Sequence, residues 1–542
     1  MFGTRSAASK RSTDELLDTM VKEEYLETPE IGNYRWAHDN VQQAASSLID
    51  EESPESFRSY IGELWIREID EDNLETCVFD IANLLNTITA DVANIEYAKI
   101  NLKAAEKAKN IAAFDSCSKY VSKGIDMLPE NKWDSEPGLA VKLHSLAAEA
   151  EGFLGHHSRM DSYCNEVLSQ SLIPTLEKKD VYLAKLHRMA NAELQYVDAI
   201  KLCLVILKDL GCTFPGGGVV GLMKALISMR KTVKMVKRTP TEVLASLPVV
   251  TDPFKLAKMT LFSRLGEWAY LAGEKFLYLY LLSTAKMVQM TLLHGLFEWS
   301  ASSLSALGAL SLFVNGDVGT AQYIGECALQ MQERCESEAG KARTLEVLYA
   351  FVFLHVKPLQ NFSKPLLEGY QSGMRTGDKS NAMWCLQFNV GVIHMTGKPL
   401  NVVEEQCRAS ITQVVELKEE ECASGLRMYW QLYLNLMGSS NNTVELSGKA
   451  MYEKEVVFTP FSRSHFIIAK TFASSLFGRY ELGAHLVLEK GDQQFLMMKG
   501  GIMYAPLFWF HRCLCMFAMA RSNKSKERKY MAQAKRIHTE LT

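Results

Sequence analysis

Several features that mark common protein classes are missing from this sequence. Its 12 cysteines include no C-x-x-C pair and no regular spacing, which argues against a disulfide framework and against a structural zinc site. No glycine-rich loop ends in Gly-Lys-Ser/Thr, so the phosphate-binding loop of an ATPase is absent. The 59 basic and 63 acidic residues nearly balance, which excludes recruitment to nucleic acid or to an anionic membrane by bulk charge. These absences favour a cytoplasmic protein with buried, reduced thiols.

Targeting and membrane segments are also scarce. Residues 1–11 are polar and slightly basic and contain no apolar core of signal-peptide type. Residues 293–314 carry one formal charge, Glu298, and residues 276–290 carry one, Lys286. Serines and glycines interrupt the first of these runs, so we predict that both are buried helices and that the chain has no membrane span.

What the sequence does contain is a recurring helix-ending turn. The spacing between successive turns is about 40 residues, with one double step of about 80, which is typical of two-helix repeats. Between residues 312 and 397, an apolar helix, a Gly-Asp turn and a second helix predict an αα-hairpin. A solenoid of such hairpins also explains a length that exceeds one compact core. The turns fall at Gly273, Gly316, Gly397, Gly438 and Gly478.

The first 50 residues follow a different pattern. Ser12 to Glu15 is typical of a helix start, with Thr13 as the cap. Tyr34-Arg35-Trp36 alternates like a short strand. Asp39 is placed to cap a further helix over 41–49. Helix, short strand and helix in this order correspond to the back half of a winged-helix unit.

A series of motifs in this order resembles a known family. The run 34–45, Tyr-Arg-Trp-Ala-His-Asp-Asn-Val-Gln-Gln-Ala-Ala, is similar to the end of the STAND-type "predicted ATPase" (AAA+) module. That module occurs in fusions with serine/threonine kinases, sensor histidine kinases and nucleotide cyclases. The resemblance covers most of residues 30–400 and weakens beyond about Gly438. Further similar segments are 57–64, 79–86, 98–108, 128–133, 210–215 and 315–317.

The resemblance implies a fold and a site. It implies an all-α, right-handed αα-hairpin (TPR-like) solenoid with a small winged-helix remnant at the amino-terminal end. It also implies that His38 faces the β-phosphate of bound ADP, as a winged-helix His-Asp pair does in STAND ATPases, while Asp39 caps the helix. The alternative is that Asp39 is a plain helix cap and His38 a structural side chain. No set of further ligands supports a metal at this pair, and we expect no cofactor.

We predict four segments along the chain. Pro215 and the three glycines after it form the clearest break, because proline and glycine do not sustain a helix. A basic amphipathic helix follows, and its six cations lie between Lys224 and Arg238. An acidic partner, phosphoinositides or nucleic acid could bind there, while a plain solvated face is the simpler interpretation. The segments are 1–52 (winged-helix-like), 53–215 (first helical array), 216–251 (glycine-rich and basic linker) and 252–542 (second helical array).

Two further groups of residues have a simple interpretation. The acidic cluster of Glu416, Glu419, Glu420 and Glu421 reads as a solvated helix face rather than a paired-carboxylate site. The aromatic and Met-rich second array reads as core packing, with a peptide-binding groove as the alternative. No Ser-His-Asp or Cys-His constellation can be recognised among the scattered histidines.

The function that these observations favour is binding. We predict a non-catalytic, TPR-like interaction and regulatory arm linked to a STAND/AAA+ signalling protein. Its partner would be another protein, such as an ATPase or kinase domain, and not nucleic acid. One alternative is a fragment of a larger multidomain ATPase or kinase whose catalytic domains are missing from this sequence. Another is an unrecognised nucleotide-dependent regulator, which tight binding of ATP or ADP would favour.

Overall fold

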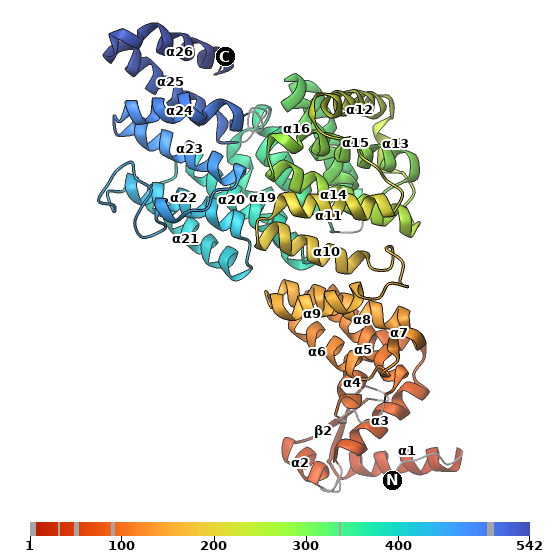
Figure 1. The fold of residues 1–542 in the computed structure, drawn as a ribbon. Coiled ribbons are helices and arrows are strands. Elements are labelled where there is room, and N and C mark those ends of the chain that lie inside the picture. Colours follow the sequence, from red (N-terminus) through yellow and green to blue (C-terminus); the bar gives the residue numbers. More distant parts are fainter. Residues whose placement is uncertain are drawn as a thin grey trace. The chain divides into compact units, whose positions relative to one another are not determined.

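The computed structural model describes residues 7–30, 33–47, 54–87, 93–334, 338–495 and 503–541. About 77% of the chain is helical, so the prediction of a helical protein is confirmed (Figure 1). The chain forms two compact units. The first contains residues 1–104 and 122–130, and the second contains residues 105–121 and 131–542.

The first unit begins with a β-hairpin between two helices. Strands β1 (Leu26–Glu30) and β2 (Asn33–Trp36) pair antiparallel and connect α1 (Ala7–Lys22) to α2 (Asp39–Ser47). The strand predicted at 34–36 is therefore confirmed, whereas β1 was not predicted because it contains Pro29. Proline is tolerated here because each strand of a two-stranded sheet is an edge strand. The helix start predicted at Ser12 is wrong, since α1 already begins at Ala7. The winged-helix assignment stays a prediction.

Helices α3 (Pro54–Glu68) and α4 (Glu71–Leu85) complete most of this unit. Asp70 caps α4 by accepting a hydrogen bond from the amide of Asn73 at 2.9 Å. A side chain at Gly62 would lie 2.9 Å from Leu85, so glycine allows the two helices to approach closely. Helices α5 (Ile95–Asn110) and α6 (Phe114–Asp126) contribute residues to both units.

The second unit is built from helices that pack on their neighbours in the sequence. Pairs such as α16 with α17, α19 with α20, and α25 with α26 are joined by short turns (Figure 1). The α-helices are α7 (Lys132–Ser135), α8 (Pro137–Phe153), α9 (His157–Leu168), α10 (Lys179–His187), α11 (Tyr196–Asp209), α12 (Gly218–Arg238), α13 (Thr241–Ala245), α14 (Pro253–Leu271), α15 (Leu277–His294), α16 (Ser300–Asn315), α17 (Val318–Arg334), α18 (Lys341–Val347), α19 (Ser363–Thr376), α20 (Lys379–Met395), α21 (Leu400–Glu416), α22 (Glu420–Leu436), α23 (Pro460–Leu476), α24 (Tyr480–Phe495), α25 (Ala505–Ser522) and α26 (Glu527–Leu541).

Short helices of other types interrupt this series. Two are π-helical and continue an α-helix directly, which inserts extra residues into its register. The π-helices are η1 (Arg188–Ala192) and η3 (Leu348–Val352). The 3₁₀ turns are η2 (Glu274–Phe276), η4 (Phe353–His355), η5 (Leu359–Asn361), η6 (Glu453–Glu455) and η7 (Lys524–Lys526). Among the described residues, the isolated bridge between Val249 and Leu296 is the β-pairing outside the hairpin.

The recurring turns lie where the sequence places them. Each follows the last turn of a helix and has a positive φ that glycine adopts without strain. The φ angles are 92° at Gly273, 64° at Gly316, 75° at Gly397, 75° at Gly438 and 69° at Gly478. Over 312–397 the structure has two helix pairs rather than one hairpin, α16 with α17 and α19 with α20, and α18, η3, η4 and η5 lie between the pairs. The right-handed solenoid and its TPR likeness stay predictions.

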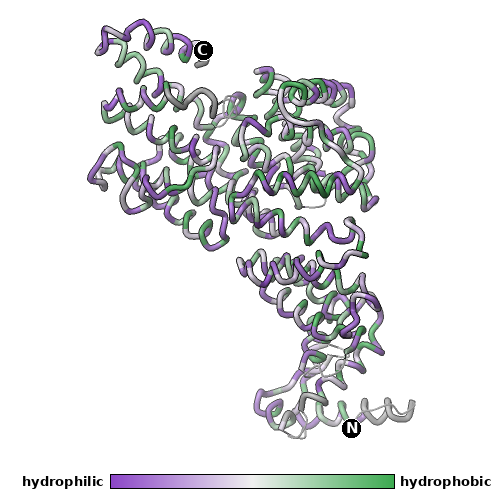
Figure 2. Tube along the Cα trace, viewed as in Figure 1, coloured by the Kyte–Doolittle hydropathy of each residue, from purple (hydrophilic) through white to green (hydrophobic). Residues whose placement is uncertain are grey.

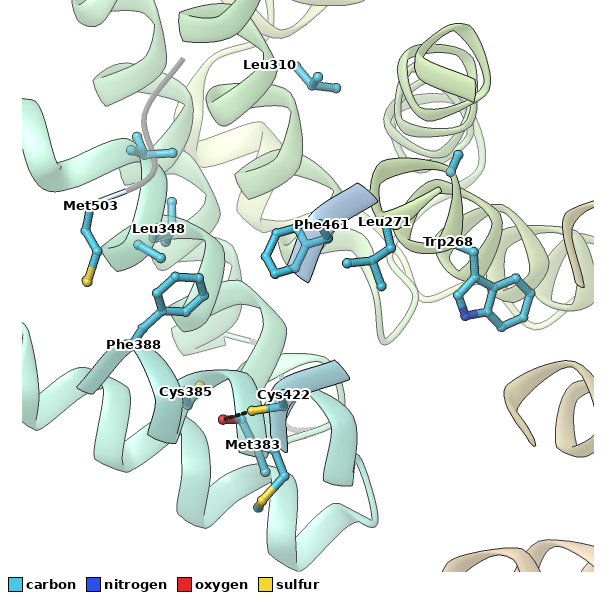
Figure 3. Close-up of a cluster of buried hydrophobic side chains, with 14 of the residues drawn as sticks. Trp268, Leu271, Leu310, Leu348, Met383, Cys385, Phe388, Cys422, Phe461 and Met503 are labelled. Carbon is cyan, nitrogen blue, oxygen red and sulfur yellow. Dashed lines mark hydrogen bonds between the residues drawn. The ribbon is translucent and has the colours of Figure 1, made fainter. Parts of the chain in front are cut away.

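The core of the second unit runs through these helices. Apolar and polar stretches are mixed along the helices of this unit, as hydropathy colouring shows (Figure 2). In Figure 3, Phe461 of α23 lies between Leu271 of α14 and Phe388 of α20, three helices that are far apart in the sequence. Cys422 donates to the carbonyl of Met383 at 3.3 Å within the same core.

One helical segment in the described residues, 274–294, is long and apolar enough to cross a membrane by length and composition. Half of its apolar window (50%) is buried in the protein. The segment, formed by η2 and α15, packs against α12, α14 and α16.

Hydrogen bonds join segments on either side of residues 216–251. Asn191 of η1 donates to Ser380 of α20 at 2.5 Å, and the Tyr196 hydroxyl donates to Glu421 of α22 at 2.9 Å. Helix α11 also packs against α14. Both sides of the predicted linker therefore belong to one compact unit, while the four-segment division itself stays a prediction.

These contacts predict the result of limited proteolysis. We expect trypsin to cut first within 216–251, because the cations of α12 are exposed. The two products should then co-elute in gel filtration without denaturant, since buried hydrogen bonds hold them together. The fragments should separate only in denaturant. Elution as two separate species under native conditions would contradict the described packing.

Candidate functional site

The predicted pair His38 and Asp39 lies between β2 and α2 on the first unit. Both side chains are exposed. The carbonyl of His38 accepts hydrogen bonds from the amides of Val41 and Gln42 at 3.0 and 3.2 Å. His38 therefore immediately precedes α2, and Asp39 is the first residue of this helix. A carboxylate in the first helical turn still suits the positive end of the helix dipole. A nucleotide-sensing role stays a prediction.

Within the described residues, no group of three or more His, Cys, Asp or Glu side chains is arranged to hold a metal. The eleven cysteines that are described are all free thiols. Burial raises the pKa of Cys117 to about 12 and that of Cys164 to about 11. A thiol with so high a pKa holds almost no thiolate at neutral pH and is a poor nucleophile.

The strongest polar site is a cleft in the second unit, which we call the basic cleft. It is formed by α8, α9, α10, η1, α14, the start of α20 and the turn between α21 and α22. About 1180 Å³ of its space is free of atoms, and part of that space is open to solvent. Five basic and four acidic side chains line it: Lys109, Arg188, Arg264, Lys379 and Lys418, with Glu149, Asp180, Glu298 and Glu419.

Lys379 is the central cation of the basic cleft. It is 7% exposed, and its ammonium donates to the carbonyls of Gly152 and Leu417 at 3.3 and 3.1 Å. These carbonyls end helices α8 and α21, where the helix dipole favours a positive charge. Burial lowers the pKa of Lys379, while Glu419 acts in the opposite direction. In the described residues no carboxylate forms a salt bridge with this ammonium, and Glu419 acts on it only at longer range.

Most other charges of the cleft are already paired. Lys109 binds Glu149 at 2.7 Å, and Glu419 accepts from Ser380 at 2.9 Å and lies 3.8 Å from His187. His187, Ser380 and Lys379 lower the pKa of Glu419 against the opposing effect of burial. The cleft therefore keeps a carboxylate of its own in the ionised form without neutralising Lys379.

The positive potential of the basic cleft also acts on His157. Burial lowers the pKa of His157, and the charges of Arg188, Lys379 and Lys418 lower it further. Lys418 is exposed and adopts a positive φ of 61° at the end of α21. These side chains converge at the Lys379 end of the cleft, where a negatively charged group would be attracted.

Several buried polar atoms of the cleft residues lack a hydrogen-bond partner. Buried polar atoms are nearly always paired, and exceptions need an explanation. A bound molecule that reorders these side chains is one such explanation. The atoms are His157 Nδ1, Arg188 Nε, Asn191 Oδ1, Trp268 Nε1 and Glu419 Oε1.

The acidic cluster differs from its predicted role. Glu419 and Glu421 are 6% and 5% exposed, so the expectation of a solvated face is wrong for these two residues. Glu421 accepts from Tyr196 and from Thr459 at 2.9 and 2.7 Å, and burial raises its pKa. The sequence contains one signal of this. Glu419 and Glu421 are two positions apart at a helix start, so their side chains point to different faces and cannot both lie on one solvated face.

The basic helix α12 fits its simpler interpretation. Its six cations between Lys224 and Arg238 are all exposed. Its opposite face, which includes Ala225, Met229 and Val236, is buried. Gln289 of α15 donates to Thr232 on that face at 2.7 Å. The helix is therefore a packed element with a solvated basic surface.

Comparison with known proteins adds no relative. No protein-family model matches the chain, and no curated protein is similar to it. The likeness to the STAND ATPase module thus rests on the motifs quoted above.

Proposed function

We propose that this chain is a non-catalytic, TPR-like protein-interaction and regulatory arm of a STAND/AAA+-linked signalling protein. In this proposal the basic cleft holds an acidic segment of a partner protein, such as an ATPase or kinase domain. Lys379 carries the argument, because it is a buried ammonium without a carboxylate partner in the described residues. A carboxylate supplied by a partner would compensate that charge and form the strong type of charge-assisted hydrogen bond.

The arrangement of helices supports binding over catalysis. Stacked helix pairs present extended surfaces to which a peptide can be bound by side chains from several helices. The basic cleft draws its residues from at least six helical elements, so one bound segment would contact them simultaneously. The described residues provide neither a phosphate-binding loop nor an activated thiol in this cleft.

The experiment is a titration of the full chain with fluorescein-labelled peptides of eight residues or so, read by anisotropy. An acidic peptide rich in Asp and Glu should bind, and its Asn/Gln counterpart should bind far more weakly. Lys379→Met should weaken binding by about tenfold or more, the usual effect of losing one partner of a buried charge pair. The exposed Lys398, at the other end of α20, provides the matched control Lys398→Met, which should bind as the parent does.

A second variant guards against a folding defect. Lys418 is exposed, so Lys418→Met should leave thermal stability unchanged and still weaken binding of the acidic peptide several-fold. Binding should also weaken as salt concentration rises. Equal affinity for the acidic and neutral peptides, or no effect of either cleft substitution, would refute the proposed function.

A further inference from the structure

A separate pocket of the second unit is lined by five aromatic rings, each in contact with the next so that the contacts form a closed circuit. We call it the aromatic pocket. Tyr270, Phe351, Phe388, Trp384 and Phe461 contact one another in that order, and Phe461 closes the circuit on Tyr270. The ring centroids are 6.2, 5.8, 6.3, 5.2 and 5.9 Å apart along it. The five rings come from α14, η3, α20 and α23, and they line about 830 Å³ of space, part of it open to solvent.

Glu346 lies in the wall of the aromatic pocket and lacks a partner. Glu346 is 8% exposed. Its carboxyl group makes no hydrogen bond or ion pair with the described residues. The hydroxyl of Tyr270, in the same pocket, is fully buried and unpaired, whereas the carboxyl oxygens of Glu346 are not fully closed off from the pocket. A buried carboxyl group without a partner is costly, which points to a ligand that supplies one.

The other charges around the aromatic pocket already balance. Arg343 donates to Glu267 at 3.0 Å, and Arg264 lies 3.1 Å from Glu267 and 3.8 Å from Asp378. Two guanidinium groups thus face two carboxylates. Ionised Glu346 would add one negative charge, which Arg343 favours and burial opposes more strongly. A bound cation would lower the raised pKa of Glu346 and so let its carboxyl group ionise at neutral pH.

The rings themselves favour a cation. An aromatic face attracts a positive charge within about 6 Å, more strongly when water is excluded. Lysine or arginine side chains lie over other aromatic rings of this protein, such as Trp299, 4.7 Å from Arg264. In the described residues, none lies over the five rings of the circuit. The cationic side chains of the described residues therefore do not occupy these rings.

We infer that the aromatic pocket binds an organic monocation with an apolar body, its alkylammonium group held between the carboxylate of Glu346 and the aromatic rings. The apolar body would contact Leu271 and Leu310, which also line the pocket. Leu271 lies beside Phe461 in Figure 3. The inference is independent of the basic cleft, so either can fail without the other.

The test uses the full chain and three probes of similar size: hexylammonium, hexyltrimethylammonium and neutral 1-hexanol, measured by calorimetry. At least one of the two cations should bind about tenfold or more tightly than hexanol, as one added charge interaction predicts. Stronger binding of hexylammonium would indicate hydrogen bonding to Glu346, and stronger binding of hexyltrimethylammonium would indicate contact with the rings. Failure of both cations to bind at about 10 mM would overturn the inference.

Two variants and a control locate the site. Glu346→Gln keeps the shape of the side chain and should weaken cation binding by about tenfold, while hexanol binding stays unchanged. Phe351→Leu removes one ring of the circuit and should weaken cation binding more than hexanol binding. Glu405→Gln, at an exposed carboxylate on α21, should behave as the parent. Cation binding that is unchanged in both pocket variants would show that the site lies elsewhere.

The pH dependence gives a further readout. The pKa of Glu346 is raised to about 8. Burial is the largest cause, Arg343 acts to lower this pKa, and Glu267 and Asp378 act to raise it. Cation binding requires the ionised form, so affinity should increase between about pH 6 and pH 8.5. In Glu346→Gln this increase should disappear. The titratable and charged groups around Glu346 are Arg343 on its own helix, Arg264, Glu267 and Tyr270 on α14, Tyr280 on α15, and Asp378 before α20.

Discussion

Gly295→Ala is expected to destabilise the second unit by about 3 kcal/mol or more. Gly295 ends α15 with φ 116° and ψ −176°, a region of backbone space that is almost restricted to glycine and costs other residues about 1–3 kcal/mol. An added Cβ would also lie 2.0 Å from the carbonyl oxygen of Pro248. Because that atom belongs to the backbone, the clash cannot be relieved by a side-chain rotation.

The clash would also release a loop. The amide of Leu296 donates to the carbonyl of Pro248 at 2.7 Å, and the amide of Val250 donates to the carbonyl of Leu296 at 2.8 Å. These bonds hold the segment before α14 against the end of α15. The measurements are thermal unfolding by calorimetry, where the melting temperature should fall, and proteolysis at 246–252, where the rate should rise.

Gly316→Ala provides the matched control. Gly316 also has a positive φ, of 64°, but no atom lies within 4 Å of the site of its missing Cβ. Its replacement should cost only about 1 kcal/mol, the conformational penalty without a clash. Equal effects of the two substitutions would show that the contact with Pro248 is unimportant.

Lowering the pH from 7.5 to 5 is expected to remove about 2 kcal/mol of stability through His465 alone. His465 is fully buried, and burial lowers its pKa from 6.5 to about 3. The unfolded chain therefore takes up a proton first as the pH falls below 6.5. Stability that is present above that value is lost progressively until about pH 3, where the folded form is protonated too.

The contacts of His465 indicate the variant to use. The Tyr429 hydroxyl lies 2.8 Å from Nδ1, and Nε2 has no partner. His465→Gln retains an acceptor for Tyr429 and does not titrate. Its loss of stability between pH 7.5 and 5 should therefore be about 2 kcal/mol smaller than that of the parent. His294→Gln, at an exposed residue, should keep the pH dependence of the parent. A parent-like pH dependence of His465→Gln in chemical denaturation would rule out this account.

Local features of the fold could be predicted from the sequence. Turns such as Gly316 and Gly397 are recognisable because a helix end followed by glycine has a local cause, the positive φ. The strand at 34–36 was also recognisable, whereas β1 was hidden by a proline that only an edge strand accepts.

The candidate sites depend on contacts that no local pattern encodes. Lys379 meets Gly152, 227 residues earlier in the chain, and the aromatic circuit joins residues from 270 to 461. Periodicity marks such aromatic residues only as apolar. The burial of Glu419 and Glu421 arises in the same way, because other helices cover what the sequence presents as a charged cluster.

The hydrogen bond from Tyr196 to Glu421 also constrains how the chain is made. The two residues are 225 positions apart, and a ribosome adds about 5–20 residues per second. Tyr196 therefore leaves the ribosome roughly 10–45 s before its acceptor exists. During this interval α14, which packs against α11, is already made. The apolar face of α11 can therefore be covered well before its hydrogen bond to Glu421 forms, so this bond is one of the late contacts of the fold.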